Sequence, residues 1–127
     1  MNKEFAGRTY VVTGAARGIG LAVVKRLLNE GARVHACDID AISPNNMHTD
    51  LNFHLIDVRD EESVAKLFYS LKQSGEKING LVNNAAILDS TQFDELNSER
   101  IKEVLEINLG GTLNFTRYAV PLLEASV

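Results

Sequence analysis

The segment Thr13–Gly20 reads Thr-Gly-Ala-Ala-Arg-Gly-Ile-Gly and lies between two apolar stretches. Before it, residues 10–12 are typical of a buried parallel strand, and after it, residues 19–28 have the pattern of an amphipathic helix. A glycine-rich turn that joins a strand to a helix brings free backbone N–H groups and the positive end of the helix to one point. The sequence therefore predicts an anion site at which a pyrophosphate fits.

A carboxylate follows the next β-branched run. Residues 33–38 end in Asp38, eighteen residues after Gly20, and a dinucleotide site keeps a carboxylate for the adenosine ribose at about this distance. Asp38 would accept hydrogen bonds from two ribose hydroxyls and would repel a 2′-phosphate, which favours NAD over NADP. Arg17 favours NADP instead, because a guanidinium beside the turn could hold that phosphate. A turn aspartate and a solvated arginine are the alternatives.

Composition narrows the class of protein. The chain has 127 residues, 45% of them hydrophobic and 24% charged, with a net charge of −4, so we expect one domain over residues 1–127 and no nucleic-acid partner. The single cysteine, Cys37, excludes an internal disulfide and fits a reducing cytosol. No apolar run approaches the ~18 residues of a membrane span, and the first residues do not resemble a signal peptide. We expect a cytoplasmic protein that does not bind membranes.

Strand and helix patterns alternate along the chain, as in βαβ units around a parallel sheet. We expect strands at residues 9–13, 33–38, 53–58 and 80–83, and helices at residues 18–30, 60–75 and 99–123, with Pro121 as a candidate kink. Residues 39–52 are expected to form a loop or one short turn, and not a full helix. Right-handed crossovers give the strand order 3-2-1-4. The predicted fold class is α/β, a three-layer Rossmann-like doubly wound parallel sheet, truncated to about four strands, with its ligand crevice between the first and fourth.

Two more of these strands end in residues that suit a nucleotide. Asp57 can accept from the adenine amino group while the N–H of Val58 donates to the ring; alternatively, Asp57 caps the helix that begins near Asp60. Asn84 and Ala85, within Asn-Asn-Ala-Ala, suit a cofactor that lies against the backbone, although asparagine is also common at strand ends.

Other classes of site fit less well. The glycines Gly14, Gly18 and Gly20 are spaced G-x-x-x-G-x-G, and no Gly-Lys-Ser/Thr follows, which excludes a phosphate-loop NTPase. A methyltransferase, which also uses a glycine turn and a ribose-binding acid, stays as an alternative.

The histidines do not suggest a metal site. His35, His48 and His54 lack metal-ligand spacing with any acid or cysteine. We expect His35 and His54 to be structural residues of strands, His48 to be solvated, and Cys37 to be a small buried residue. No metal is predicted, and no nucleophile–base pair is visible.

Taken together, these motifs resemble the classical short-chain dehydrogenase/reductase family over the whole chain. The family's Thr-Gly-x-x-x-Gly-Ile-Gly matches Thr13–Gly20, its acid after the second strand matches Asp38, and its helix asparagine matches Asn108. Its Asp-Val matches residues 57–58, and its Asn-Asn-Ala-Gly matches residues 83–86 with Ala86 in place of glycine. The resemblance implies an NAD(P)-dependent oxidoreductase that transfers hydride between the nicotinamide and a small carbonyl or alcohol substrate.

The resemblance also implies residue roles. Asn83 would brace its strand. Asn108 would be the catalytic residue, which kinks its helix and holds a water of a proton relay; a mid-helix polar residue bonding backbone is the alternative. The implied cofactor-binding residues are Gly14, Arg17, Gly18, Ile19, Gly20, Asp38, Asp57, Val58, Asn84 and Ala85.

The family's catalytic serine and Tyr-x-x-x-Lys have no match here. Tyr10, Tyr69 and Tyr118 are each followed four residues later by a residue other than lysine, so we expect this incomplete family fold to be inactive alone. A non-catalytic nucleotide-binding or assembly module, from a truncated or split gene, is the alternative. An uncovered fourth strand and the long last helix predict a homodimer or larger homo-oligomer.

Overall fold

The computed structural model describes residues 3–127. Its strands are β1 (Thr9–Thr13), β2 (Arg33–Asp38), β3 (Leu51–Leu55) and β4 (Gly80–Val82), and its main helices are α1 (Gly18–Asn29), α2 (Glu61–Gln73), α3 (Ser98–Leu105) and α4 (Thr112–Glu124). Single 3₁₀ turns lie at Pro44–Asn46 and Phe93–Glu95. The loop expected between the second and third strands is therefore confirmed, with only one short turn in it.

The four strands form one parallel sheet in the order β3-β2-β1-β4. Thr9–Thr13 of β1 pairs with Arg33–Cys37 of β2, and β4 pairs with the middle of β1. The predicted order and fold class are confirmed. All four carboxyl ends meet at one edge of the sheet, on both sides of the switch point between β1 and β4.

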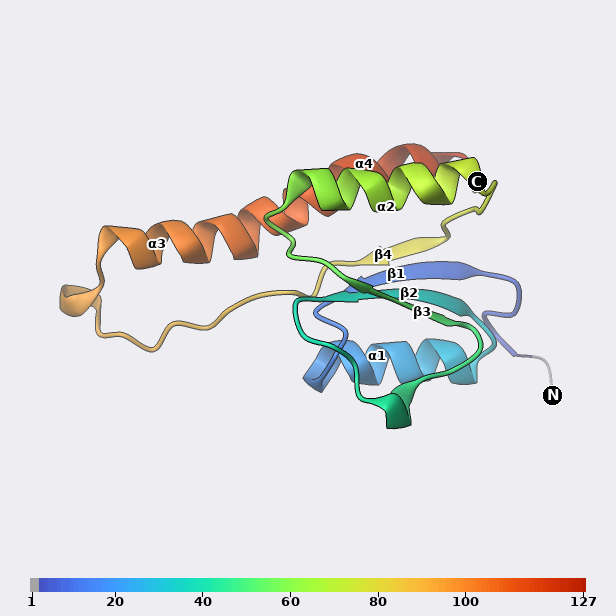
Figure 1. Cartoon of the computed structure of the whole chain (residues 1–127), viewed down its shortest axis with the longest axis horizontal. Coiled ribbons are helices and arrows are strands. Elements are labelled where there is room, and N and C mark those ends of the chain that lie inside the picture. Colours follow the sequence, from blue (N-terminus) through green and yellow to red (C-terminus); the bar gives the residue numbers. More distant parts are fainter. Residues whose placement is uncertain (1–2) are drawn as a thin grey trace.

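Helices cover both faces of this sheet (Figure 1). The α1 face has a core built around Val12, Val24 and Val34, and the opposite face packs against α2 and α4 around Val11, Val64 and Phe115. Successive strand residues alternate between these two cores, because side chains of a strand point to opposite faces. The result is a three-layer structure, in which a hydrophobic core on each face of the sheet holds the carboxyl edge in place.

The third strand differs from its predicted range. It spans Leu51–Leu55 instead of residues 53–58. The apolar residues Ile56 and Val58 misled the prediction: both are buried in the α2–α4 core, but they belong to the connection after the strand. Burial continues past the last strand pair, so hydrophobicity did not mark the end of the strand.

The long last helix is interrupted. A π-helical turn, Glu106–Gly111, separates α3 from α4, and α4 continues through Pro121 to Glu124. The irregularity therefore lies at the turn that contains Asn108, and not at the proline. A side chain at Gly111 would collide with Val58, so glycine is needed where this helix crosses the connection after β3.

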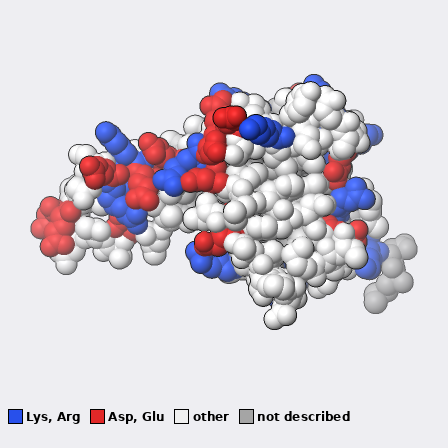
Figure 2. Space-filling view, in the orientation of Figure 1, with Lys and Arg blue, Asp and Glu red and all other residues white. Residues whose placement is uncertain are grey.

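Together with the loop before it, α3 projects from the sheet (Figure 1). Lysine, arginine, aspartate and glutamate side chains of both signs gather on this projection, while the middle of the same face is largely uncharged (Figure 2). Within residues 3–127, no helix has the length and apolar character needed to cross a bilayer.

Candidate functional site: an open cleft at the carboxyl edge

An open cleft of about 260 Å³ lies at the carboxyl edge of the sheet. Residues from the ends of all four strands, or from the segments that follow them, line it together with Ile107 of the π-helical turn. The strand-end residues are Gly14, Arg17, Asp38, Ile39, Ile56, Asp57, Val58, Arg59, Asn84, Ala85, Ala86 and Ile87. The topology explains the gathering, because parallel strands deliver their C-terminal residues to the same edge.

The turn between β1 and α1 needs its glycines for three reasons. Gly14 and Gly18 have φ values of +63° and +60°, a region that side chains disfavour. A Cβ at Gly14 would lie 2.8 Å from Nδ2 of Asn84, whereas a Cβ at Gly18 would meet nothing within 4 Å. A Cβ at Gly20 would collide with the carbonyl oxygen of Gly14. Gly14 and Gly20 are therefore packed against other protein atoms, whereas Gly18 faces open space.

The N-terminus of α1 has no cap. Arg17 occupies the N-cap position, no side chain accepts from the first amides, and the first turn contains no acid. By contrast, Asp60 caps α2 and Asn97 caps α3, each accepting from a backbone N–H of its own helix. The first amides of a helix have no carbonyl partner within it. The amides of α1 are therefore left for an anion, and the helix dipole favours one there.

The end of β4 is tied to this turn. The hydroxyl of Thr13 accepts from the backbone N–H groups of Asn84 and Ala85, both at 3.0 Å. The amide of Asn84 donates to the carbonyl of Gly14 at 3.1 Å. Asn83, one residue earlier, donates to the hydroxyl of Thr116 at 3.1 Å. Both asparagines therefore brace backbone or helix, and Asn84 does so at the cleft.

Asp38 joins the second strand to the glycine turn. Its Oδ2 accepts from the backbone N–H of Ala16 at 2.9 Å, and its Oδ1 accepts from that of Asp40 at 3.0 Å. Each carboxylate oxygen has a second lone-pair site, so the group can still accept hydroxyl donors from the cleft. The turn-forming role and the ligand-binding role of Asp38 are therefore compatible.

Both cationic side chains that line the cleft are paired. Nη2 of Arg17 lies 3.3 Å from Oδ2 of Asp40, in an exposed pair. Arg59 grips Asp57 with its Nε and Nη2 at 2.7–3.1 Å. The side-chain hydrogen bond from Arg59 is the main cause that lowers the pKa of Asp57, so this carboxylate is ionised at neutral pH.

The alternative role of Asp57 as a helix cap is wrong. The side chain of Asp60 accepts from the backbone N–H of Ser63 at 3.3 Å and from its hydroxyl at 2.6 Å. The carboxylate of Asp57 is instead occupied by the backbone N–H and guanidinium of Arg59. Each of the two aspartates thus binds a residue two or three positions further along the chain, and only Asp60 caps the helix.

Asn108 anchors the segment after β4. Its Oδ1 accepts from the backbone N–H of Ile87 at 2.8 Å, and its Nδ2 donates to the carbonyl of Ile87 at 2.9 Å. This two-bond contact places the π-helical turn against the rim of the cleft, since Ile87 lines it.

Known proteins similar in sequence identify the family. The family profile described as short chain dehydrogenase matches residues 8–126. The chain belongs to the short-chain dehydrogenase family. An L-fucose dehydrogenase of Bos taurus is 33% identical, over 99% of this chain and 48% of that protein. An NADP-dependent (R)-specific alcohol dehydrogenase of Lentilactobacillus kefiri is 30% identical, over 98% of this chain and 52% of that protein.

A solved short-chain dehydrogenase has the same fold. The structure from Leptospira borgpetersenii, with bound NAD⁺, superposes with a TM-score of 0.91 at 26% identity, covering 98% of this chain and 49% of that one. The chain spans about half the length of the relatives that it matches.

Most of the sequence-predicted site residues of this short-chain dehydrogenase chain meet in one cleft. Gly14, Arg17, Asp38, Asp57, Val58, Asn84 and Ala85 line it. Gly18, Ile19 and Gly20 form the first turn of the adjoining helix, where Ile19 is exposed and Gly20 is buried. Asn108 does not line the cleft but binds the backbone of Ile87, which does. Within residues 3–127, no group of three or more His, Cys, Asp or Glu side chains could hold a metal ion.

Sequence reasoning missed three polar residues of the site. The hydroxyl of Thr13 fastens β4, Asp40 pairs with Arg17, and Arg59 grips Asp57. For Arg59 a signal existed, because a cation two residues after a strand-end aspartate is within reach of its carboxylate. The pairing of Arg17 with Asp40 had no such local signal, since it depends on how close β1 and β2 bring their following turns.

Proposed function

We propose that this chain is the cofactor-binding half of an NAD-dependent oxidoreductase that transfers hydride between the nicotinamide and a carbonyl or alcohol substrate. The observation that carries the proposal is the uncapped start of α1 in the same cleft as Asp38. One group offers free amides to a pyrophosphate, and the other offers a carboxylate to a ribose. The bound dinucleotide would supply the hydride chemistry, and the chain would supply its placement.

The residue roles follow from position. The start of α1 would hold the pyrophosphate, Asp38 would accept from the ribose hydroxyls, and Asp57 would accept from the adenine amino group. Val58 would donate its N–H to the ring, and Ala85 would lie against the cofactor. The proposed cofactor-binding set is Gly14, Arg17, Gly18, Ile19, Gly20, Asp38, Asp57, Val58, Asn84 and Ala85.

Asn108 is proposed as a proton-relay residue of the complete site. Both polar atoms of its side chain already bind Ile87. A relay water would bind the second lone-pair site of its Oδ1 or the second hydrogen of its Nδ2, which these contacts leave free to bond. The side chain would also hold the π-helical turn and the cleft rim in place.

NAD is proposed over NADP on the charge of the site. The Leptospira borgpetersenii protein holds NAD⁺ and the Lentilactobacillus kefiri protein is NADP-dependent, so family membership leaves the choice open. In this chain, Asp38 stands at the end of β2, where a 2′-phosphate would meet a carboxylate.

Calorimetric titration with NAD tests the proposal. Asp38→Ala removes the charged acceptor of two hydroxyls and should raise the Kd by about 10- to 100-fold. Asp50→Ala, an exposed aspartate just before β3, is the matched control and should leave the Kd unchanged. If NAD does not bind, or binds equally to the Asp38→Ala variant, the cofactor assignment is refuted.

Activity and assembly have separate tests. No tyrosine in this sequence is followed by lysine four residues later, so NADH oxidation with a panel of ketones should show no turnover by this chain alone. The second candidate function is a non-catalytic nucleotide-binding or assembly module.

An uncovered strand edge favours assembly. Within the described sheet, β4 pairs only with β1, and Ile101, Leu105, Leu109 and Leu113 are exposed along α3, the π-helical turn and α4. We therefore propose a homodimer or larger assembly, and the single cysteine supports our proposal of a cytoplasmic location. A monomer by light scattering at tens of micromolar would remove this argument.

A further inference from the structure

We propose that Asp40 is a specificity-determining residue, which withholds Arg17 from a 2′-phosphate and so deepens the preference for NAD over NADP. The inference rests on the proposed nucleotide function, and it names a residue outside the family motifs matched above. Its basis is the ion pair between Nη2 of Arg17 and Oδ2 of Asp40, 3.3 Å apart beside the cleft.

The position of Asp40 is set by Asp38. Oδ1 of Asp38 accepts from the backbone N–H of Asp40 at 3.0 Å, while Oδ2 accepts from the N–H of Ala16, one residue before Arg17. The carboxylate of Asp38 thus binds the backbone of both segments that carry the ion pair, next to Arg17 and at Asp40. The facing of Arg17 and Asp40 is a consequence of the same contact that aims Asp38 at the cleft.

The pairing leaves the cleft without a free cation for an additional phosphate. Of the residues that line it, only Arg17 and Arg59 are cationic, and Arg59 is held by the carboxylate of Asp57. A guanidinium is the group best suited to bind a phosphate in two hydrogen bonds. NADP differs from NAD by one such phosphate, so its affinity depends on whether Arg17 can leave Asp40.

The pair can be opened without harm to the fold. The side chains of Arg17 and Asp40 are 80% and 53% exposed, and exposed ion pairs contribute little to stability. Removing the charge of Asp40 therefore frees Arg17 and also removes a repulsive carboxylate, while the backbone bond from Asp40 to Asp38 stays in place.

The test is a double-mutant cycle read by calorimetric titration with NAD and with NADP, at one low salt concentration. Asp40→Asn should raise the ratio of NADP affinity to NAD affinity on the order of 10-fold. In the Arg17→Ala background, the same substitution should change the ratio by less than about 2-fold. Asp50→Asn is the matched control, with a side chain that is also 53% exposed, and it should leave the ratio unchanged.

Three results of this experiment would overturn the inference. An unchanged ratio in Asp40→Asn overturns the inference, and so does a rise that is equally large when Arg17 is absent, because Asp40 would then act by repulsion alone. An equal rise in Asp50→Asn also overturns it, as a general charge effect. Failure of the wild-type protein to bind either nucleotide is a different result, which overturns the proposed function itself together with this refinement.

Discussion

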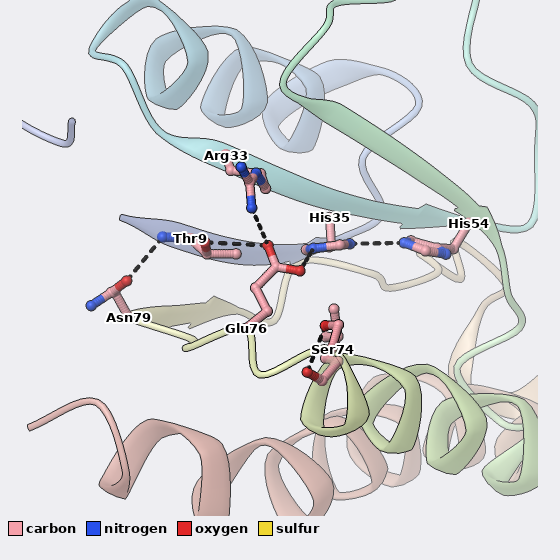
Figure 3. A network of polar contacts seen from close by, with 8 residues as sticks. Thr9, Arg33, His35, His54, Ser74, Glu76 and Asn79 are labelled. Carbon is pink, nitrogen blue, oxygen red and sulfur yellow. Dashed lines mark hydrogen bonds and ion pairs between the residues drawn. The ribbon is translucent and has the colours of Figure 1, made fainter. Parts of the chain in front are cut away.

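Two regions of the parallel sheet carry polar groups arranged in opposite ways. At the carboxyl edge, the amides of α1 have no side-chain cap and Asp38 keeps acceptor sites toward an open cleft. A second chain of contacts, which we call the Glu76 network, begins at the amino edge with Thr9 and Arg33 and runs through Glu76 and His35 to His54, near the end of β3 (Figure 3). The groups at the carboxyl edge can still form hydrogen bonds with a ligand, whereas the groups of the Glu76 network are hydrogen-bonded to one another.

The Glu76 network is closed because its members are hydrogen-bond partners of one another. Oε2 of Glu76 accepts from Nε2 of His35 at 3.1 Å, and Nδ1 of His35 lies 3.0 Å from Nε2 of His54. With both histidines neutral, Nε2 of His54 donates to Nδ1 of His35. Among the described residues, no buried side-chain nitrogen or oxygen lacks a partner.

The comparison shows that charge alone does not mark a binding site in this fold. Both regions contain carboxylates and arginines, and both bring together segments far apart in the sequence. They differ in what remains unsatisfied: a ligand gains most where free donors and acceptors face solvent, whereas a buried group must be paired within the protein.

The largest expected effect on stability comes from Glu76. The Glu76 side chain is 15% exposed, and Glu76→Ala leaves the buried His35 without its acceptor, so the free energy of unfolding should fall by about 2 kcal/mol. NAD affinity should stay unchanged, because Glu76 does not line the cleft. Urea unfolding and calorimetric titration measure the two quantities.

Glu62→Ala is the control for this variant. Glu62 forms an exposed i,i+4 pair with Lys66, and its loss should change the free energy of unfolding by less than about 0.5 kcal/mol. If Glu76→Ala weakens NAD binding as strongly as it weakens the fold, the two polar regions are not independent and the comparison fails.

An intermediate effect is expected from two glycines with the same backbone conformation. Gly18 begins α1 with φ +60° and Gly75 follows α2 with φ +72°, and a Cβ at either would meet nothing within 4 Å. Alanine should therefore cost about 1 kcal/mol of stability at each position. Only Gly18→Ala should also weaken NAD binding, by at least about 10-fold, because its Cβ would stand where a phosphate approaches.

Measuring both properties for both variants separates the roles. Equal losses of NAD affinity in Gly18→Ala and Gly75→Ala would mean that the loss comes from general destabilisation. The glycine turn would then have no specific role in binding, and the contrast between an open and a closed region would lose its main support.

The sequence predicted the strand order and most elements, because hydrophobic period and glycine position act locally. It could not end β3 correctly, since Ile56 and Val58 remain buried after the strand stops. Residue patterns offered Pro121 as a candidate kink of the last helix, whereas the family resemblance implied a kink at Asn108; the π-helical turn lies at Glu106–Gly111, beside a contact from Asn108 to Ile87. Such long-range contacts leave no local pattern.

The two polar regions were predictable to different degrees for the same reason. Glycine spacing and strand-end acids placed most of the cleft, because topology sends every strand end to one edge. His35 and Glu76 lie 41 residues apart and meet through packing of the segment after α2. Sequence reasoning predicted a structural role for His35 but no partner, since no spacing rule connects His35 to Glu76.

The smallest expected effect is a pH dependence confined to the Glu76 network. Burial, and then the neighbouring His35, lower the pKa of His54 below its ordinary value of 6.5. The unfolded chain therefore binds this proton more readily than the folded chain. Stability from neutral His54 is present above about pH 6.5 and is lost as the pH falls through the folded pKa.

Glu76 extends the same trend to lower pH. Burial raises the pKa of its carboxyl, but hydrogen bonds and charges from His35 and Arg33 outweigh this, and the net pKa lies below 4.5. Its contribution is present above about pH 4.5 and is lost as the pH falls further. The free energy of unfolding should therefore decline in two steps, the first from His54 and the second from Glu76.

Urea unfolding across about pH 7.5 to 2.5 measures this decline. His54→Asn should flatten the first step, while His48→Asn, at an exposed loop position, should not. NAD affinity should stay nearly constant through the first step, because no histidine lines the cleft and the lowered pKa of Asp57 keeps that carboxylate ionised. A first step that persists in His54→Asn would mean that another group causes it. An NAD affinity that falls together with the first step would show that protonation of the Glu76 network affects the cleft, so this experiment measures how independent the two polar regions are within one small sheet.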